Sequence, residues 1–121
     1  SIDLAYVSAG KIALIKKDLN LARAHLEKAM SIGTNNPNDR QMLAMTYLDL
    51  RMNSEAIQQF NLVLQANPSQ TMSIGGKAVA LARLGQKEKA MNILREANEN
   101  YPNNSNIQRA MNVVFQSGNN Q

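Results

Sequence analysis

The sequence has no cysteine and no tryptophan, and aromatic residues make up only 4% of its 121 residues. Without cysteine, the chain cannot form disulfide bonds, cysteine-based zinc sites or a cysteine nucleophile. With so few aromatic residues, its core has to be filled by Leu, Ile, Ala and the seven Met. This composition favours packed helices over sheets, because strands are enriched in β-branched and aromatic residues.

The chain also lacks an apolar run of the ~20 residues that a membrane-spanning helix needs. Its net charge of +4 is only mildly basic, and nucleic-acid binding would call for basic residues interleaved with aromatic ones. We therefore predict no membrane span and no nucleic-acid partner. Because the chain starts at Ser1 rather than at Met and shows no signal peptide, we interpret it as a piece of a longer protein.

Catalytic and metal-binding patterns are missing as well. His25 is the only histidine, and one histidine without cysteine does not build a zinc site. The stretch Gly75-Gly76-Lys77 looks like the end of a phosphate-binding loop, but that motif would need glycine at Thr71 and a hydroxyl residue at Ala78. We expect no catalytic residue, no metal, no cofactor and no enzymatic activity.

What the sequence does contain is a repeat with a period of 34 residues. Ala22, Ala56 and Ala90 stand at equal spacing and open three similar segments, and Pro68 and Pro102 have the same spacing. Repeats of this length indicate a stack of supersecondary units. Further residues recur in register without a gap: Leu26, Phe60 and Leu94; Ala13, Tyr47 and Leu81; Gly10, Ala44 and Ala78.

Each unit is predicted to form two helices. Pro37 suits the first position of a helix, where its missing N–H would be unpaired anyway, and proline after a helix prevents its continuation. The predicted units cover residues 3–36, 37–70 and 71–104. A final helix over 105–117 is expected, with Ser105 as its N-cap. It either covers the end of the stack or belongs to an array that continues beyond Gly118.

This pattern resembles the tetratricopeptide repeat family, over nearly the whole chain. The resemblance implies an all-α fold, a right-handed α–α superhelix of about three helix–turn–helix repeats plus a C-terminal helix, in one domain over residues 1–121. Two departures from the family pattern are that Lys17 and Arg51 replace the turn glycine. The matching residues are Tyr6, Gly10, Ala22, Leu26, Ala29, Leu43, Ala44, Tyr47, Ala56, Phe60, Pro68, Ala78, Leu81, Gly85, Ala90, Leu94, Ala97 and Pro102.

The resemblance also implies a binding surface, because first helices of this family line a concave groove. Carried over position by position, it predicts an apolar, methionine-rich groove with a charged rim, which would suit a partner peptide or helix. The predicted partner-binding residues are Lys11, Gln41, Met42, Met45, Asp49, Met72, Gly75, Gly76, Val79, Arg83 and Arg109.

Several alternatives stay open within this groove. Met42 and Met45 could be core residues instead of exposed ones. Gly75 and Gly76 either leave bare backbone in the groove wall for a partner, or mark a helix that starts late or bends. The mode by which some members bind an acidic chaperone tail is not expected, because its lysines, asparagines and arginine are replaced here by Val7, Lys11, Met42, Met72 and Gly76.

The predicted function is that of a non-catalytic scaffold for protein–protein interaction. The alternative is a self-assembly module, in which copies dock through the ends of the repeat stack to form a homo-oligomer. A narrower resemblance, to bacterial envelope proteins that assist pilus assembly or secretion, would place the protein in the cytoplasm or in the periplasm and envelope. The sequence does not identify the partner.

Overall fold

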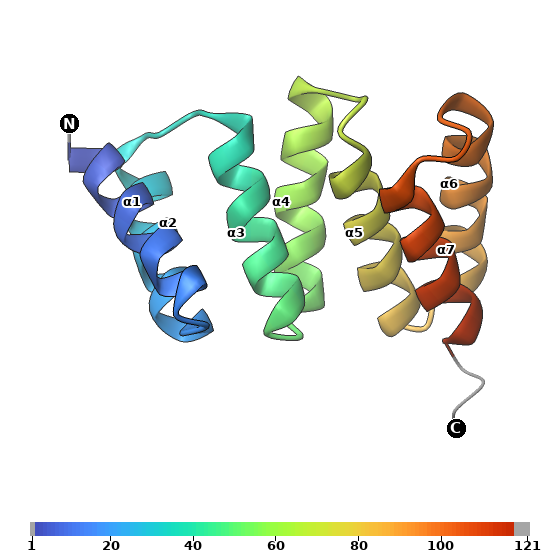
Figure 1. Cartoon of the computed structure of the whole chain (residues 1–121), viewed down its shortest axis with the longest axis horizontal. Coiled ribbons are helices and arrows are strands. Elements are labelled where there is room, and N and C mark those ends of the chain that lie inside the picture. Colours follow the sequence, from blue (N-terminus) through green and yellow to red (C-terminus); the bar gives the residue numbers. More distant parts are fainter. Residues whose placement is uncertain (1, 118–121) are drawn as a thin grey trace.

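The computed structural model describes residues 2–117, and all regular structure in that part of the chain is helical (Figure 1). Tail residues 118–121, which include the predicted end at Gly118, lie outside the described residues. The helices are α1 (Ile2–Ile15), α2 (Leu19–Ile32), α3 (Pro37–Asp49), α4 (Asn53–Ala66), α5 (Thr71–Arg83), α6 (Lys87–Asn100) and α7 (Ser105–Gln116).

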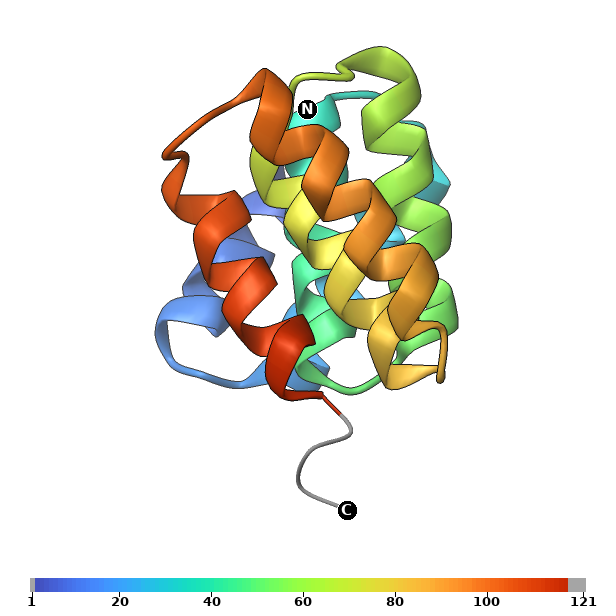
Figure 2. The same cartoon turned by 90° about the vertical axis from the view of Figure 1, so that its right-hand side faces the viewer.

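The helices form the predicted right-handed superhelix of paired helices, with α7 as a single last helix. Within each pair the two helices pack side by side: α1 on α2, α3 on α4 and α5 on α6. Each following first helix packs on the second helix before it, and α7 also packs on α5. Figure 2 shows the resulting two layers, with α1 and α7 on one side of the molecule and α4 and α6 on the other.

The tight packing of the pairs comes from alanines at the repeat positions. Ala22, Ala56 and Ala90 are fully buried, one in each second helix. Small side chains let neighbouring helices approach closely, and the large residue one turn later fills the space between them. These larger residues are Leu26, Phe60 and Leu94, and they are also fully buried.

Side-chain oxygens that accept from backbone amides cap the starts of α2, α3 and α7. Asn36 caps α3 through a bond from the Asn38 amide, and Pro37 takes the first helical position as predicted. The prediction that Ser105 caps α7 is wrong. The Asn104 side chain caps this helix by accepting from the amides of Asn106 and Ile107, and Ser105 is its first helical residue.

The turns inside the three repeats share one backbone conformation. Lys17 has φ 62°, Arg51 has φ 63° and Gly85 has φ 87°. A positive φ costs free energy for a residue with a Cβ, whereas glycine adopts it without that cost. The family's turn glycine is therefore replaced in two repeats by residues that still adopt its left-handed conformation. Among the described helices, none has the length and apolarity to cross a membrane.

Candidate functional site: the concave groove

The first helices α1, α3, α5 and α7 present one face to the inside of the superhelix. Two pockets open on this face next to each other. The first has a volume of about 230 Å³ and lies between α3, α5 and α7. It is lined by Met45, Leu48, Met72, Gly75, Gly76, Val79, Asn106, Arg109, Ala110 and Val113.

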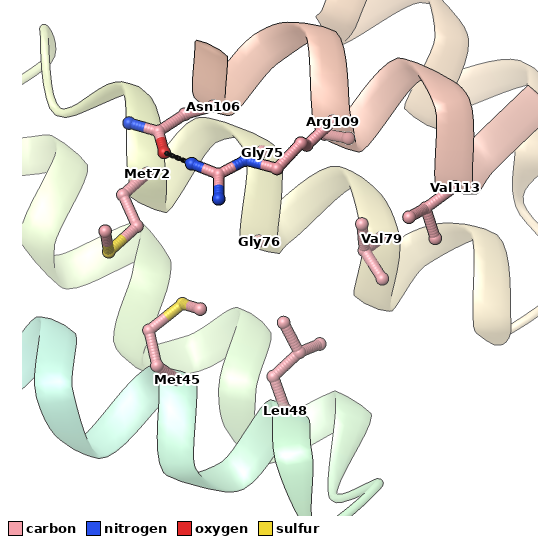
Figure 3. Close-up of a pocket in the computed structure, with 10 residues that line it drawn as sticks. Met45, Leu48, Met72, Gly75, Gly76, Val79, Asn106, Arg109 and Val113 are labelled. Carbon is pink, nitrogen blue, oxygen red and sulfur yellow. Dashed lines mark hydrogen bonds between the residues drawn. The ribbon is translucent and has the colours of Figure 1, made fainter.

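The walls of this first pocket are apolar and its rim is polar. Figure 3 shows Met45 and Leu48 of α3 facing Met72 and Val79 of α5 across the pocket. Val113 of α7 is 51% exposed and extends this apolar surface. Such a combination of apolar walls and few polar groups is typical of sites that bind apolar side chains or small ligands.

The second pocket, of about 280 Å³, lies between α1, α3 and α5. It shares Met45 and Met72 with the first pocket, so the two form one groove divided by these methionines. Its lining is Leu14, Asn38, Gln41, Met42, Met45, Thr46, Asp49 and Met72.

The methionines combine the two roles that the sequence left open. Met42 and Met45 are half-buried and pack against the hydrophobic core, yet both line pockets. Met72 is 41% exposed. Because methionine is unbranched and has three rotatable bonds, such a surface can adapt to different apolar side chains.

Gly75 and Gly76 lie inside α5, which begins at Thr71, so the alternative of a helix that starts late is wrong. Both glycines line the first pocket, but both are also covered by neighbouring helices. A Cβ on Gly75 would lie 3.1 Å from the Ala110 Cβ, and one on Gly76 would lie 2.3 Å from the Phe60 ring. The glycines therefore first of all allow close approach of α5 to α4 and α7.

Hydrogen bonds hold polar residues around the groove, both between repeats and within one helix. The Ser73 hydroxyl donates to Gln41 Oε1 at 2.7 Å, which links α5 to α3. Arg109 is exposed, and its Nη2 donates to Asn106 Oδ1 at 3.0 Å within α7. Figure 3 shows this Arg109 guanidinium at the mouth of the first pocket.

Arg83 has a different environment from the other groove cations. Its Nη1 donates to the Leu48 carbonyl at 2.8 Å and reaches Asn53 Oδ1 at 3.4 Å. Burial lowers the pKa of Arg83, and the nearby Arg51 charge lowers that pKa further, whereas Asp49 raises it. The guanidinium therefore connects the end of α5 to the end of α3.

The structure brings most of the predicted groove residues together. Gln41, Met42, Met45, Asp49, Met72, Gly75, Gly76, Val79 and Arg109 all line one or both pockets. Lys11 is exposed on α1 and Arg83 is half-buried, and neither is part of the pocket lining. The role of all these residues in binding stays a prediction.

Some lining residues were not among the predicted ones. Leu14 and Leu48 occupy the same position in the first and second repeats, and Asn106 and Ala110 occupy groove positions of the last helix. The repeat register alone could have identified these four. Thr46 was missed for another reason: its hydroxyl donates to the Met42 carbonyl, and only packing brings it to the second pocket.

Comparison with known proteins agrees with this architecture. A family profile described as "Psidin, N-terminal TPR repeats region" matches residues 41–121, and one described as "Tetratricopeptide repeat" matches residues 4–35. No curated protein sequence matches the chain.

Solved structures with a similar fold include a TPR domain of OM64 from Arabidopsis, with 17% identity, a TM-score of 0.81 and 95% of each chain covered. The first TPR of Spaghetti (RPAP3), bound to the HSP90 peptide SRMEEVD, has 22% identity and a TM-score of 0.80, with 95% of this chain and 91% of that one covered. YrrB, described as a TPR protein with an unusual peptide-binding site, has 18% identity and a TM-score of 0.77, and the match covers 98% of this chain and 70% of YrrB.

Proposed function

The chain belongs to the tetratricopeptide repeat family, and from this premise we propose that it is a non-catalytic module whose concave groove binds a segment of a partner protein. The observation that carries the proposal is the pair of adjacent apolar pockets that share Met45 and Met72. Exposed apolar surface of this kind marks interaction sites in soluble proteins.

The pockets suit side chains better than a whole small molecule. Each holds about 230 or 280 Å³ and stays open to solvent along the groove. A peptide or helix that runs along the groove would place one apolar side chain in each pocket, and Met45 and Met72 would contact both. Two structurally similar proteins are described as peptide-bound or peptide-binding, which supports a peptide ligand for the same concave fold.

The chemistry of this groove differs from a site that clamps a terminal carboxylate. Val7 is buried and Gly76 has no side chain, and Met42 and Met72 are apolar. Of the five positions that would hold the carboxylate, only Lys11 carries a charge. We therefore propose a ligand recognised mainly by its apolar side chains.

The proposal is tested by selecting binders from a displayed library of random peptides and measuring their affinity by fluorescence anisotropy. Met72→Lys would put a cation at the centre of the groove, and we expect it to weaken binding by roughly tenfold or more. The matched control is Leu62→Lys on α4. Leu62 is 44% exposed, close to the 41% of Met72, but it lines neither groove pocket.

Two results would overturn the proposal. One is a library that yields no peptide bound above background. The other is a set of peptides that bind Met72→Lys and Leu62→Lys equally well. A role in bacterial pilus assembly or secretion is a separate hypothesis that rests on sequence resemblance, and it is tested by whether peptides from pilus or secretion proteins compete for the groove.

A further inference from the structure

The two groove pockets have similar apolar walls but differ in charge. Their volumes are about 230 and 280 Å³, and Met45 and Met72 line both of them. Size and apolar contacts alone therefore do not determine which of two apolar side chains enters which pocket. The first pocket is lined by one charged residue, Arg109, and the second by one of opposite sign, Asp49. Such a difference in charge can set the direction in which a ligand binds.

A chain of hydrogen bonds holds Arg109 at the first pocket. Asn106 Nδ2 donates to Thr71 Oγ1 at 3.1 Å, which connects the start of α7 to the start of α5. Arg109 Nη2 donates to Asn106 Oδ1 at 3.0 Å, and its Nε donates to the Ser105 carbonyl at 3.4 Å. Figure 3 shows the guanidinium at the mouth of the pocket. Because the cation is positioned before a ligand arrives, little side-chain entropy is lost on binding.

The Arg109 guanidinium can still bind a carboxylate. Within residues 2–117 it forms no ion pair, and its Nη1 donates to no acceptor. A guanidinium with free N–H groups matches the geometry of a carboxylate. Terminal carboxylates are captured by several converging donors, whereas Asn106, the other polar residue of this pocket, already donates to Thr71. The ligand group that fits best is therefore an Asp or Glu side chain.

Asp49 gives the second pocket the opposite sign. It is exposed at the end of α3 and forms no hydrogen bond or ion pair with any residue that the structure describes. The nearby Arg83 uses its Nη1 on the Leu48 carbonyl and on Asn53 Oδ1 instead. The Asp49 carboxylate can therefore accept from a Lys or Arg of a ligand. Because the Arg83 charge repels such a cation, we expect this contact to be weaker than the one at Arg109.

We propose that the groove binds a segment with a fixed order of charges. One apolar side chain occupies each pocket, an acidic side chain lies next to the one in the first pocket, and a basic side chain lies next to the one in the second. This inference rests on the proposed function, since it concerns the ligand of the same groove. The segment binds in one direction, because the reverse direction would place each of its charges beside a groove residue of the same sign.

The test uses a peptide selected from the random library and synthesised with an acetylated N-terminus and an amidated C-terminus, so that only side chains are charged. A second peptide exchanges its acidic and basic residues and keeps every apolar one. We expect the wild-type chain to bind the selected peptide roughly tenfold more tightly in fluorescence anisotropy, because each exposed charge pair contributes a few-fold in affinity. Salt at about 1 M should reduce this preference, because it screens exposed charges.

Substitution of the groove charges tests the assignment. Arg109→Glu should weaken binding of the selected peptide by roughly fivefold or more. The matched control is Arg95→Glu, because Arg95 is exposed on α6, donates to Asn92 three positions earlier and lines neither groove pocket. It makes the same change in charge and should leave the affinity unchanged. The double variant Asp49→Lys/Arg109→Glu keeps the net charge and should bind the exchanged peptide more tightly. Circular dichroism confirms that the variants are folded.

Failure of this inference is distinguishable from failure of the proposed function. If Met72→Lys weakens binding but the wild-type chain binds both peptides equally well, the groove binds a peptide and the charge order is wrong. The charge order is also wrong if the selected peptides lack the acidic or the basic residue, if Arg109→Glu binds like Arg95→Glu, or if the double variant keeps the wild-type preference. If no peptide binds above background, the proposed function fails and this inference fails with it.

Discussion

The ring of Phe60 lies directly against the backbone of Gly76, so closely that a Cβ at Gly76 would be 2.3 Å from Phe60 Cζ. Phe60 is fully buried in α4, and Gly76 sits in the interior of α5. A glycine inside a helix costs roughly 0.5–1 kcal/mol relative to alanine. Glycine fits at this position because the second repeat carries the larger Phe60 where the first and third repeats carry Leu26 and Leu94.

This contact predicts that Gly76→Ala destabilises the protein, although alanine is the better helix former. The new methyl group has to displace the ring of Phe60, which is fully buried, and such overpacking costs typically 1–3 kcal/mol. We expect a net loss of about 1–2 kcal/mol in the free energy of unfolding. Urea unfolding followed by circular dichroism measures it, and an unchanged or higher midpoint would contradict the contact.

A second substitution should repair the first. Phe60→Leu together with Gly76→Ala recreates the combination that the next pair of repeats uses, Leu94 with Ala110. Phe60→Leu alone should cost about 1 kcal/mol, because it leaves a space beside Gly76. In the double variant the two losses should partly cancel, giving a coupling energy on the order of 1 kcal/mol. Simple additivity of the two losses would show that the residues do not interact.

The turn of the first repeat offers a stabilising substitution. Lys17 has φ 62° where Gly85 of the third repeat has φ 87°. Lys17→Gly relieves the left-handed strain, and we expect a gain of about 0.5–1 kcal/mol. Lys17→Ala is the control, because it removes the same charge but keeps the strain, and it should bring no gain. Gly85→Ala should lose about 1 kcal/mol through strain alone, since no atom lies within 4 Å of the new Cβ.

The sequence predicted the repeat fold in detail because the fold depends on a spacing that every repeat shows. Ala22, Ala56 and Ala90 stand in equivalent places, and the helices begin and end within one residue of the same register. The groove pockets follow from the same register, which is why most of their lining was expected. Leu48 and Asn106 were missed, although they occupy groove positions in that register.

Some features could not be predicted from the sequence because they depend on contacts between residues in different repeats. The role of Gly76 is set by Phe60 of the preceding repeat, and the exposure of Ile12 is set by the lack of a packed neighbour among the described residues. The cap of α7 was misassigned for a local reason: Asn104 and Ser105 are both good caps, and the chain geometry selects Asn104.

Arg83 is predicted to act on stability. Its guanidinium donates to the Leu48 carbonyl at the end of α3, where a positive charge is also favoured by the helix dipole. Arg83→Met keeps the apolar stem and removes the donor, and we expect a loss of about 1 kcal/mol. Arg83→Lys should lose less. If Arg83→Met instead leaves the unfolding midpoint unchanged and weakens peptide binding, Arg83 belongs to the binding surface.

The hydrogen bond between Tyr47 and Glu27 predicts a dependence of stability on alkaline pH. The Tyr47 hydroxyl donates to Glu27 Oε2 at 2.5 Å and joins α3 to α2. Burial raises the pKa of Tyr47, and the hydrogen bond and negative charge of Glu27 raise that pKa further. The folded chain therefore holds the phenol proton to a higher pH than the unfolded chain, whose tyrosine titrates near about 10.

Because of this difference in pKa, the contribution of Tyr47 to stability falls at alkaline pH. The stability due to the protonated phenol is complete below pH ~10 and is lost as the pH rises through the alkaline range toward the raised pKa of Tyr47. At neutral pH, Tyr47→Phe should cost about 1–2 kcal/mol. Above pH ~10 the wild-type chain loses this stabilisation, and the difference in the free energy of unfolding between wild type and Tyr47→Phe should shrink.

Urea unfolding of both chains at about pH 7 and about pH 11 measures this difference. Other titrating groups are common to both chains and cancel in the comparison. Tyr101→Phe is the matched control, because among the contacts of residues 2–117 the Tyr101 hydroxyl has no hydrogen-bond partner; it should change stability little at either pH. A constant difference between wild type and Tyr47→Phe would mean that Tyr47 is not held in its protonated form by folding, and that α2 and α3 are joined by apolar packing alone.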